Sequence, residues 1–103
     1  MISPKLVEVG RHNNIELITC SEIETLEGDP GNFEVTLVNR PRYIDPVKCT
    51  GCGECARHCP VTAVSSYNLG LDDRRATYIE YPQAVPLAFA IDTDTCVGCG
   101  LCE

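Results

Sequence analysis

The sequence lacks any apolar run that approaches the ~20 residues of a membrane helix. Its first residues also lack the apolar segment of a secretion signal. Both absences predict a cytoplasmic protein that does not enter a membrane. Basic residues are few, with 8 Lys and Arg against 15 Asp and Glu and a formal net charge of −7. This balance argues against nucleic-acid binding, which needs a basic face, and suits either a basic protein partner or simple solubility.

Cysteine, by contrast, is abundant, with 8 in 103 residues, and seven of them lie between residues 49 and 102. In a reducing compartment such cysteines favour metal binding over disulfides. A chain this short buries a limited core, so bound metal is expected to add to its stability.

Residues 1–40 carry signals for a helix and a hairpin, and no catalytic constellation. Ser3 and Pro4 indicate a capped helix start, and Gly10 predicts that the helix is short. The pattern predicts strands over 15–19, 21–28 and 33–39, the last one half-buried because Phe, Val and Leu alternate with polar residues. The turn sequence GDPGN joins the last two strands.

Arg40-Pro41 marks a predicted boundary, after which the composition changes. Between the two cysteine-rich stretches, residues 64–86 are expected to be extended strands and loops. The predicted fold class is therefore α+β. A helix and β-hairpin segment over 1–40 precedes a bacterial-type two-cluster ferredoxin module over 41–103, whose second motif is incomplete.

An internal repeat supports the ferredoxin prediction. Residues 44–55 (IDPVKCTGCGEC) align with residues 91–102 (IDTDTCVGCGLC) at an offset of 47, and seven of the twelve positions are identical. The first copy continues to Cys59-Pro60, which completes C-x2-C-x2-C-x3-C-P. That run is the bacterial pattern for [4Fe–4S] clusters, in which the fourth cysteine ligates the other cluster. Glycines between the cysteines allow the backbone to approach the sulfurs closely.

The repeat assigns seven metal ligands and no catalytic residue. Cys59 is expected to complete one [4Fe–4S] cluster with Cys96, Cys99 and Cys102. A second cluster is expected on the first run, at Cys49, Cys52 and Cys55. Its fourth ligand would fall at position 106, so the chain is expected to be an excerpt of a longer one, with a first cluster that is incomplete or of the three-iron type.

Three alternatives remain open on these residues. The first is an independent small ferredoxin with an unusual N-terminal hairpin. The second is a zinc-stabilised interaction module without redox function, although zinc sites pair two CxxC knuckles and use four ligands in total. The third is a thiol–disulfide enzyme, which needs a βαβ context that the sequence does not indicate.

Other residues have simpler interpretations. Cys20 is expected to be a buried free thiol on a strand, although it could replace the missing cluster ligand. His58 and the pair Arg74-Arg75 are expected to be solvated, the alternatives being a tuning role for His58 and a docking role for the arginines. Residues 51–56 (GCGECA) formally satisfy G-x-G-x-x-A but lack a strand–turn–helix setting. No FAD binding is therefore expected of this chain alone.

Beyond the cysteines, the stretches SPKLVEVGRH and PQAVPLAFAID closely resemble the A-type subunit of the heterodisulfide reductases. These are cytosolic flavin and iron–sulfur proteins of methanogens and other anaerobes. The resemblance covers nearly the whole chain. It implies that residues 1–40 belong to a thioredoxin-reductase-like FAD domain and residues 41–103 to a ferredoxin domain inserted into it. It further implies one-electron transfer between a flavin of the parent protein and partners such as ferredoxin or other redox subunits.

Overall fold

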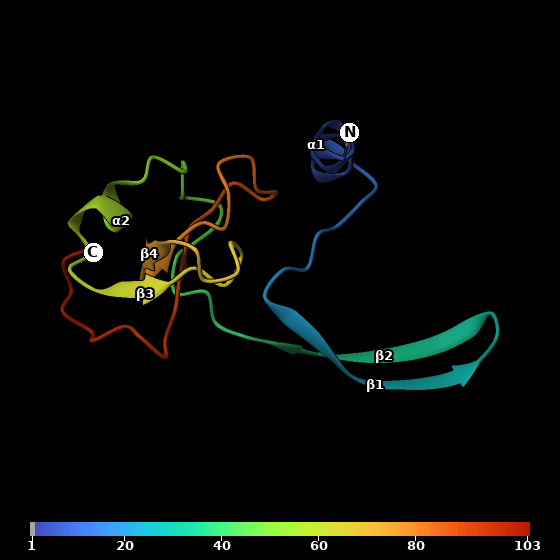
Figure 1. Cartoon of the computed structure of the whole chain (residues 1–103). Helices are drawn as coiled ribbons and strands as arrows, with labels where there is room; N and C mark the ends of the chain where they lie inside the picture. Colours follow the sequence, from blue (N-terminus) through green and yellow to red (C-terminus); the bar gives the residue numbers. More distant parts are fainter. Residues whose placement is uncertain (1) are drawn as a thin grey trace.

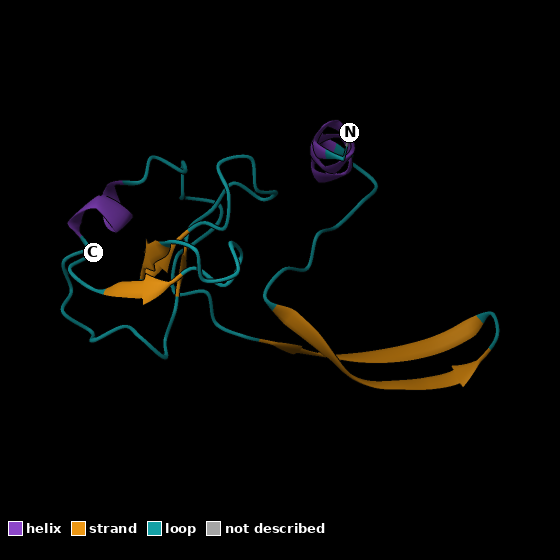
Figure 2. Cartoon of the chain, viewed as in Figure 1, coloured by secondary structure: helices purple, strands orange, loops and turns teal. Residues whose placement is uncertain are grey.

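The computed structural model describes residues 2–103, and its two parts differ in packing (Figure 1). Helix α1 (Ser3–Arg11) and the hairpin of β1 (Ser21–Asp29) and β2 (Asn32–Asn39) lie on one side. The other side holds α2 (Glu54–His58) and four short strands: β3 (Thr62–Val64), β4 (Asp73–Arg75), β5 (Thr77–Tyr78) and β6 (Ala90–Ile91). Figure 2 shows that loops make up much of this second part. Within residues 2–103, no helix is long and apolar enough to span a membrane.

Helix α1 begins where proline indicated, but serine does not cap it. Pro4 lies in the first turn, where a missing N–H costs nothing. The cap position is Ile2, and no side chain bonds the first turn. The hydroxyl of Ser3 instead donates to Oε1 of Gln83 at 3.0 Å. The prediction that Ser3 caps the helix is therefore wrong, because its hydroxyl bonds to a residue that is distant in sequence.

The predicted hairpin forms, with Asp29 opposite Asn32 across the turn and Ser21 opposite Asn39 at the open end. Two details of the sequence prediction are wrong. Residues 15–19 form no strand, since a strand needs a partner and none pairs with them within residues 2–103. Strand β2 is not half-buried, because every one of its residues is exposed in this chain.

The second part is built around two short antiparallel strand pairs, β3 with β4 and β5 with β6. The expectation of extended segments and loops over 64–86 is confirmed. Its small core contains Ala76, Thr77, Ala88 and Phe89 together with the thiol of Cys59. Strand β5 follows the first cysteine run and β6 directly precedes the second. Because β5 pairs with β6, the core connects the two runs.

Candidate metal centre

The two copies of the sequence repeat have the same local structure. Asp45 and Asp92 each accept, at their main-chain oxygen, the N–H of the first cysteine of their run, at 2.9 Å from Cys49 and 2.9 Å from Cys96. Each aspartate side chain also accepts the N–H two residues further on, at 2.8 Å and 3.1 Å. This Asx turn explains why the repeat contains aspartate, since a short carboxylate can reach the backbone two residues on. Both cysteine runs therefore begin from the same fixed turn.

The structure brings Cys59 to the second run. Cys59 follows α2, and its side chain is buried. A cavity of about 310 Å³ is lined by Cys59 together with Cys96, Cys99 and Cys102. Thr77 of β5 and Ile91 of β6 line the same cavity, so the β5–β6 pair forms part of its wall. These four cysteines are the ones that the sequence assigned to one cluster.

The first run forms a loop that leads into α2. Gly51 and Gly53 have positive φ angles of 70° and 83°, a conformation that glycine adopts at little cost. Cys55 lies in α2, and the main-chain N–H of Phe89 donates to Sγ of Cys49 at 3.5 Å. A local bond of the same kind exists in the second run, where the N–H of Gly98 donates to Sγ of Cys96 at 3.4 Å. Such N–H to sulfur bonds stabilise negative charge on the thiolate.

Backbone dipoles also act on the acidity of these thiols. The pKa of Cys52 is lowered, chiefly by the main-chain N–H of Glu54 and then by the side chain of Thr50. Burial acts to raise the pKa of Cys59, but main-chain hydrogen bonds with Thr77 and Val61 outweigh it and lower that pKa. Burial raises the pKa of Cys55. Since the thiolate is the form that binds metal, the lowered pKa of Cys52 and of Cys59 favours metal binding, whereas the raised pKa of Cys55 opposes it.

The donor set fits an iron–sulfur cluster. All eight cysteines are free thiols, and soft thiolate ligands select iron–sulfur clusters, zinc or copper(I). Within residues 2–103, no group of three or more Cys, His, Asp or Glu side chains is arranged to hold a metal ion. The four cysteines assigned to one cluster line the same 310 Å³ cavity.

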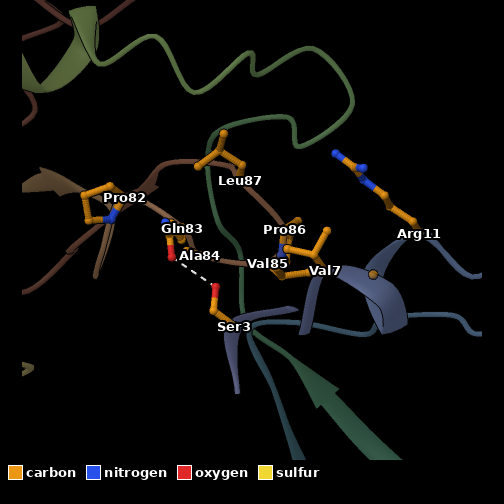
Figure 3. A pocket seen from close by; sticks show the side chains of 10 residues that line it. Ser3, Val7, Arg11, Pro82, Gln83, Ala84, Val85, Pro86 and Leu87 are labelled. Carbon is orange, nitrogen blue, oxygen red and sulfur yellow. Dashed lines mark hydrogen bonds between the residues drawn. The ribbon is translucent and has the colours of Figure 1, made fainter. Parts of the chain in front are cut away.

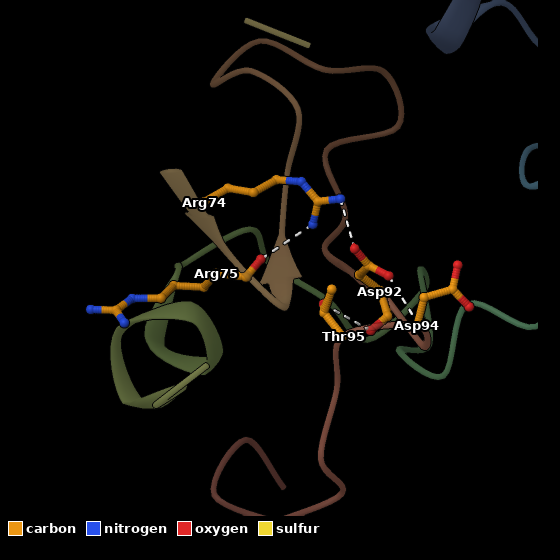
Figure 4. A network of polar contacts seen from close by, with 5 residues as sticks. All are labelled: Arg74, Arg75, Asp92, Asp94 and Thr95. Carbon is orange, nitrogen blue, oxygen red and sulfur yellow. Dashed lines mark hydrogen bonds and ion pairs between the residues drawn. The ribbon is translucent and has the colours of Figure 1, made fainter. Parts of the chain in front are cut away.

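An ion pair that the sequence did not reveal anchors the second run. The guanidinium of Arg74 donates to Oδ2 of Asp92 at 2.9 Å (Figure 4), and both side chains are more than four-fifths buried. Arg74 also lies 3.7 Å from the ring centre of Tyr78. Burial alone would raise the pKa of Asp92, but the bonds from Arg74 and from the N–H of Asp94 outweigh it and hold that pKa below its usual range. The expectation that Arg74 is solvated is wrong, and the aspartate of the repeat was the signal that could have pointed to a partner.

The remaining candidates lie away from the cysteine runs or in solvent. Cys20 is exposed, has a φ of 56° and precedes β1, so the prediction of a buried thiol on a strand is wrong. In the described part of the chain, three cavities lined by Cys20 contain no other cysteine. His58 is exposed as expected, with its Nε2 3.4 Å from Glu54. Arg75 is exposed and donates to the hydroxyl of Thr62 at 3.0 Å.

Comparison with known proteins defines the class first. The family described as 4Fe-4S binding domain matches residues 42–65, which contain the whole first run and Cys59. The chain therefore carries a ferredoxin-like 4Fe–4S binding region within a mixed α/β structure.

Relatives that match the whole chain are larger proteins, each the A-type subunit of its reductase. The chain is 50% identical to the A-type iron-sulfur subunit of the CoB–CoM heterodisulfide reductase of Methanocaldococcus jannaschii, and it spans 16% of that subunit. It is 47% identical to the A-type subunit of the H(2):CoB-CoM heterodisulfide,ferredoxin reductase of Methanothermobacter marburgensis, and it spans 16% of this subunit as well. With the corresponding protein of the Ferredoxin:CoB-CoM heterodisulfide reductase of Methanosarcina mazei the identity is 42%, over 13% of its length.

The chain is thus homologous, throughout its length, to a section of the A-type subunit of heterodisulfide reductases, and the resemblance found in its sequence is confirmed. Together with the 4Fe-4S match, these relatives support iron–sulfur electron transfer. The chain spans 13–16% of the length of these curated relatives.

Proposed function

We propose that this chain is the iron–sulfur electron-transfer section of a heterodisulfide-reductase-like A-type subunit. The main support for the proposal is the cavity shared by Cys59 and the second cysteine run. Cys59 is 37 or more residues from those cysteines in sequence, so only the fold brings them together. A bound [4Fe–4S] cluster supplies one-electron transfer at a potential that the surrounding protein adjusts.

In this proposal the cysteines act as ligands and not as nucleophiles. Cys59, Cys96, Cys99 and Cys102 hold one cluster, and Cys49, Cys52 and Cys55 supply three ligands to another. The N–H groups that donate to Cys49 and Cys96 stabilise the negative charge of the sulfurs. The two Asx turns hold the start of each run, and the Arg74–Asp92 pair fixes the second one to the core.

The parent protein supplies the rest of the electron path. We infer from the family resemblance that a flavin in the remaining part of the parent exchanges electrons with these clusters, and the name of one relative includes both heterodisulfide and ferredoxin reduction. Other subunits of a cytoplasmic complex, or a ferredoxin, are the corresponding partners. Residues 1–40 belong, in this proposal, to the flavin domain and residues 41–103 to the ferredoxin domain. The exposed apolar residues of the hairpin, such as Phe33 and Leu26, suit that division, because a flavin domain could cover them.

The test is the iron and acid-labile sulfide content of the anaerobically reconstituted protein, together with its electron paramagnetic resonance (EPR) spectra in oxidised and reduced forms. A content of about four to eight irons per chain is expected from one to two clusters, with sulfide equal to iron for cubanes and in excess of iron for a three-iron cluster. A three-iron signal in the oxidised form would show that the first cluster lacks its fourth ligand. A protein with no iron and stoichiometric zinc would overturn the proposal in favour of a zinc-stabilised module.

A further inference from the structure

The two cysteine runs are alike in sequence but differ in what lies over them. Gly51 and Gly98 occupy the same position of the repeat and have nearly the same φ, 70° and 65°. A Cβ atom built on Gly51 would lie 2.9 Å from Cγ of Leu87, which is closer than real Cβ contacts. A Cβ atom on Gly98 would meet nothing within 4 Å in the described chain. Leu87 therefore covers the first run, and no described residue covers this position of the second.

The next glycine of each run shows the same difference. A Cβ on Gly53 would lie 3.8 Å from the ring of Phe89, whereas a Cβ on Gly100 would meet nothing within 4 Å among residues 2–103. Phe89 is itself buried, at 6% exposure, and its main-chain N–H donates to Sγ of Cys49. Leu87 and Phe89 thus contact the first run at two glycines and one sulfur.

These two residues end a segment that is also attached to α1. We name residues 82–89 the cover segment. Gln83 accepts the hydrogen bond from Ser3 (Figure 3). A Cβ on Gly10 would overlap Cγ1 of Val85. A cavity of about 420 Å³ between α1 and the cover segment is lined from both sides, by Val7 of the helix among others. The cover segment is therefore held at one end by α1 and at the other by the first cysteine run.

We propose that the cover segment sets the water exposure and the reduction potential of the cluster on Cys49, Cys52 and Cys55, with Leu87 and Phe89 as positioning residues. This inference rests on the proposed function. The potential of an iron–sulfur cluster depends on hydrogen bonds to its sulfurs and on solvent exposure. Water and N–H donors both stabilise the reduced form, because it carries more negative charge. Leu87 excludes water and lowers the potential, while the Phe89 N–H raises it, so the segment controls both effects at one cluster only.

Leu87→Ala tests the water-excluding part. Leu87 is 47% exposed, so its truncation removes the cover at little cost to the core. We expect the midpoint potential of the first cluster to rise, and a chelator to remove its iron faster, while the second cluster keeps its wild-type values. Redox titration followed by EPR measures both clusters, and a Cys99→Ala background assigns the signals. Leu71→Ala, at a leucine that is 81% exposed, is the control and should behave as wild type.

A second pair of variants tests the contact from the other side. Gly51→Ala and Gly98→Ala introduce the same backbone strain, but only the first collides with the cover segment. Gly51→Ala should speed iron loss from the first cluster, and adding Leu87→Ala should produce no further increase. Gly98→Ala should leave the first cluster unchanged.

Two results would overturn the inference. One is a Leu87→Ala protein whose first cluster keeps its wild-type potential and rate of iron loss, and the other is a shift of equal size in both clusters. In either case a normal iron content of the wild type leaves the proposed function intact. Absence of iron from the wild type would overturn both together.

Discussion

Asp92 and Arg74 show how single residues fix a cysteine run in place. Asp92 forms the Asx turn before Cys96 and, through its other carboxylate oxygen, receives the guanidinium of Arg74. Asp45 forms the same turn, but the cation beside it, Lys48, is 4.0 Å away and largely exposed. The second run is therefore tied to the core by a buried pair, whereas the aspartate of the first run has only an exposed one.

Arg74→Gln should lower the free energy of unfolding at neutral pH by about 1.5–3 kcal/mol, the range for a hydrogen bond to a charged group. The loss should depend on pH. The pKa of Asp92 is lowered by folding, so its stabilising contribution is complete above the unfolded pKa of ~3.9 and is lost as the pH falls through the lower folded value. Urea unfolding at pH 7 and below pH 4 measures this. Arg75→Gln, at the exposed neighbour, should change stability by less than ~0.5 kcal/mol. Equal effects of the two variants would contradict the anchoring role of Arg74.

Cys20 is the one cysteine that lies outside both cysteine-rich stretches. It lies at the base of the hairpin, where its main-chain oxygen accepts the N–H of Arg40 at 2.7 Å. Cys20→Ser should therefore leave the iron content and the EPR spectra unchanged. Conversion of one cluster to the three-iron form in this variant would show that Cys20 is a ligand after all.

At the scale of elements, the sequence predicted the helix, the turn and the strands that depend on neighbouring residues, but it did not predict which strands pair beyond the hairpin. Proline at the start of α1, the GDPGN turn and the period-two pattern of β2 each act within a few residues, and each predicted its element correctly. The strand expected over 15–19 was wrong, because apolar alternation does not reveal whether a partner strand exists. The exposure of β2 was misjudged for the same reason, since burial depends on what covers a face and not on the strand's own residues.

The contact between α1 and the cover segment leads to an unusual prediction for Gly10→Ala. In an exposed helix, alanine is favoured over glycine by about 0.5–1 kcal/mol. Here the added methyl group would overlap Val85, so Gly10→Ala should weaken the attachment of α1. Hydrogen exchange of the α1 amides should become faster. Combining it with Val85→Ala should restore slow exchange, and faster exchange in the double variant than in Gly10→Ala alone would contradict the packing between Gly10 and Val85.

At the scale of the whole molecule, the sequence predicted the chemistry better than the architecture. The spacing of seven cysteines specifies a ligand pattern without any fold, and an offset of 47 relates the two runs. What the spacing could not supply is the asymmetry between them. Phe89 contacts a sulfur 40 residues away in sequence, and Arg74 finds Asp92 from 18 residues away. Such contacts depend on how the folded chain packs, and no local sequence pattern predicts them.

The most direct test of the proposed cluster ligation is EPR of the reduced, iron-loaded protein with Cys59→Ala, together with its iron content. Cys59 follows the first run in sequence but shares its cavity with the second. We expect that the cluster on Cys96, Cys99 and Cys102 is lost or becomes labile, while the signal of the cluster on Cys49, Cys52 and Cys55 persists. Selective loss of the first-run cluster, with the second intact, would contradict this ligation.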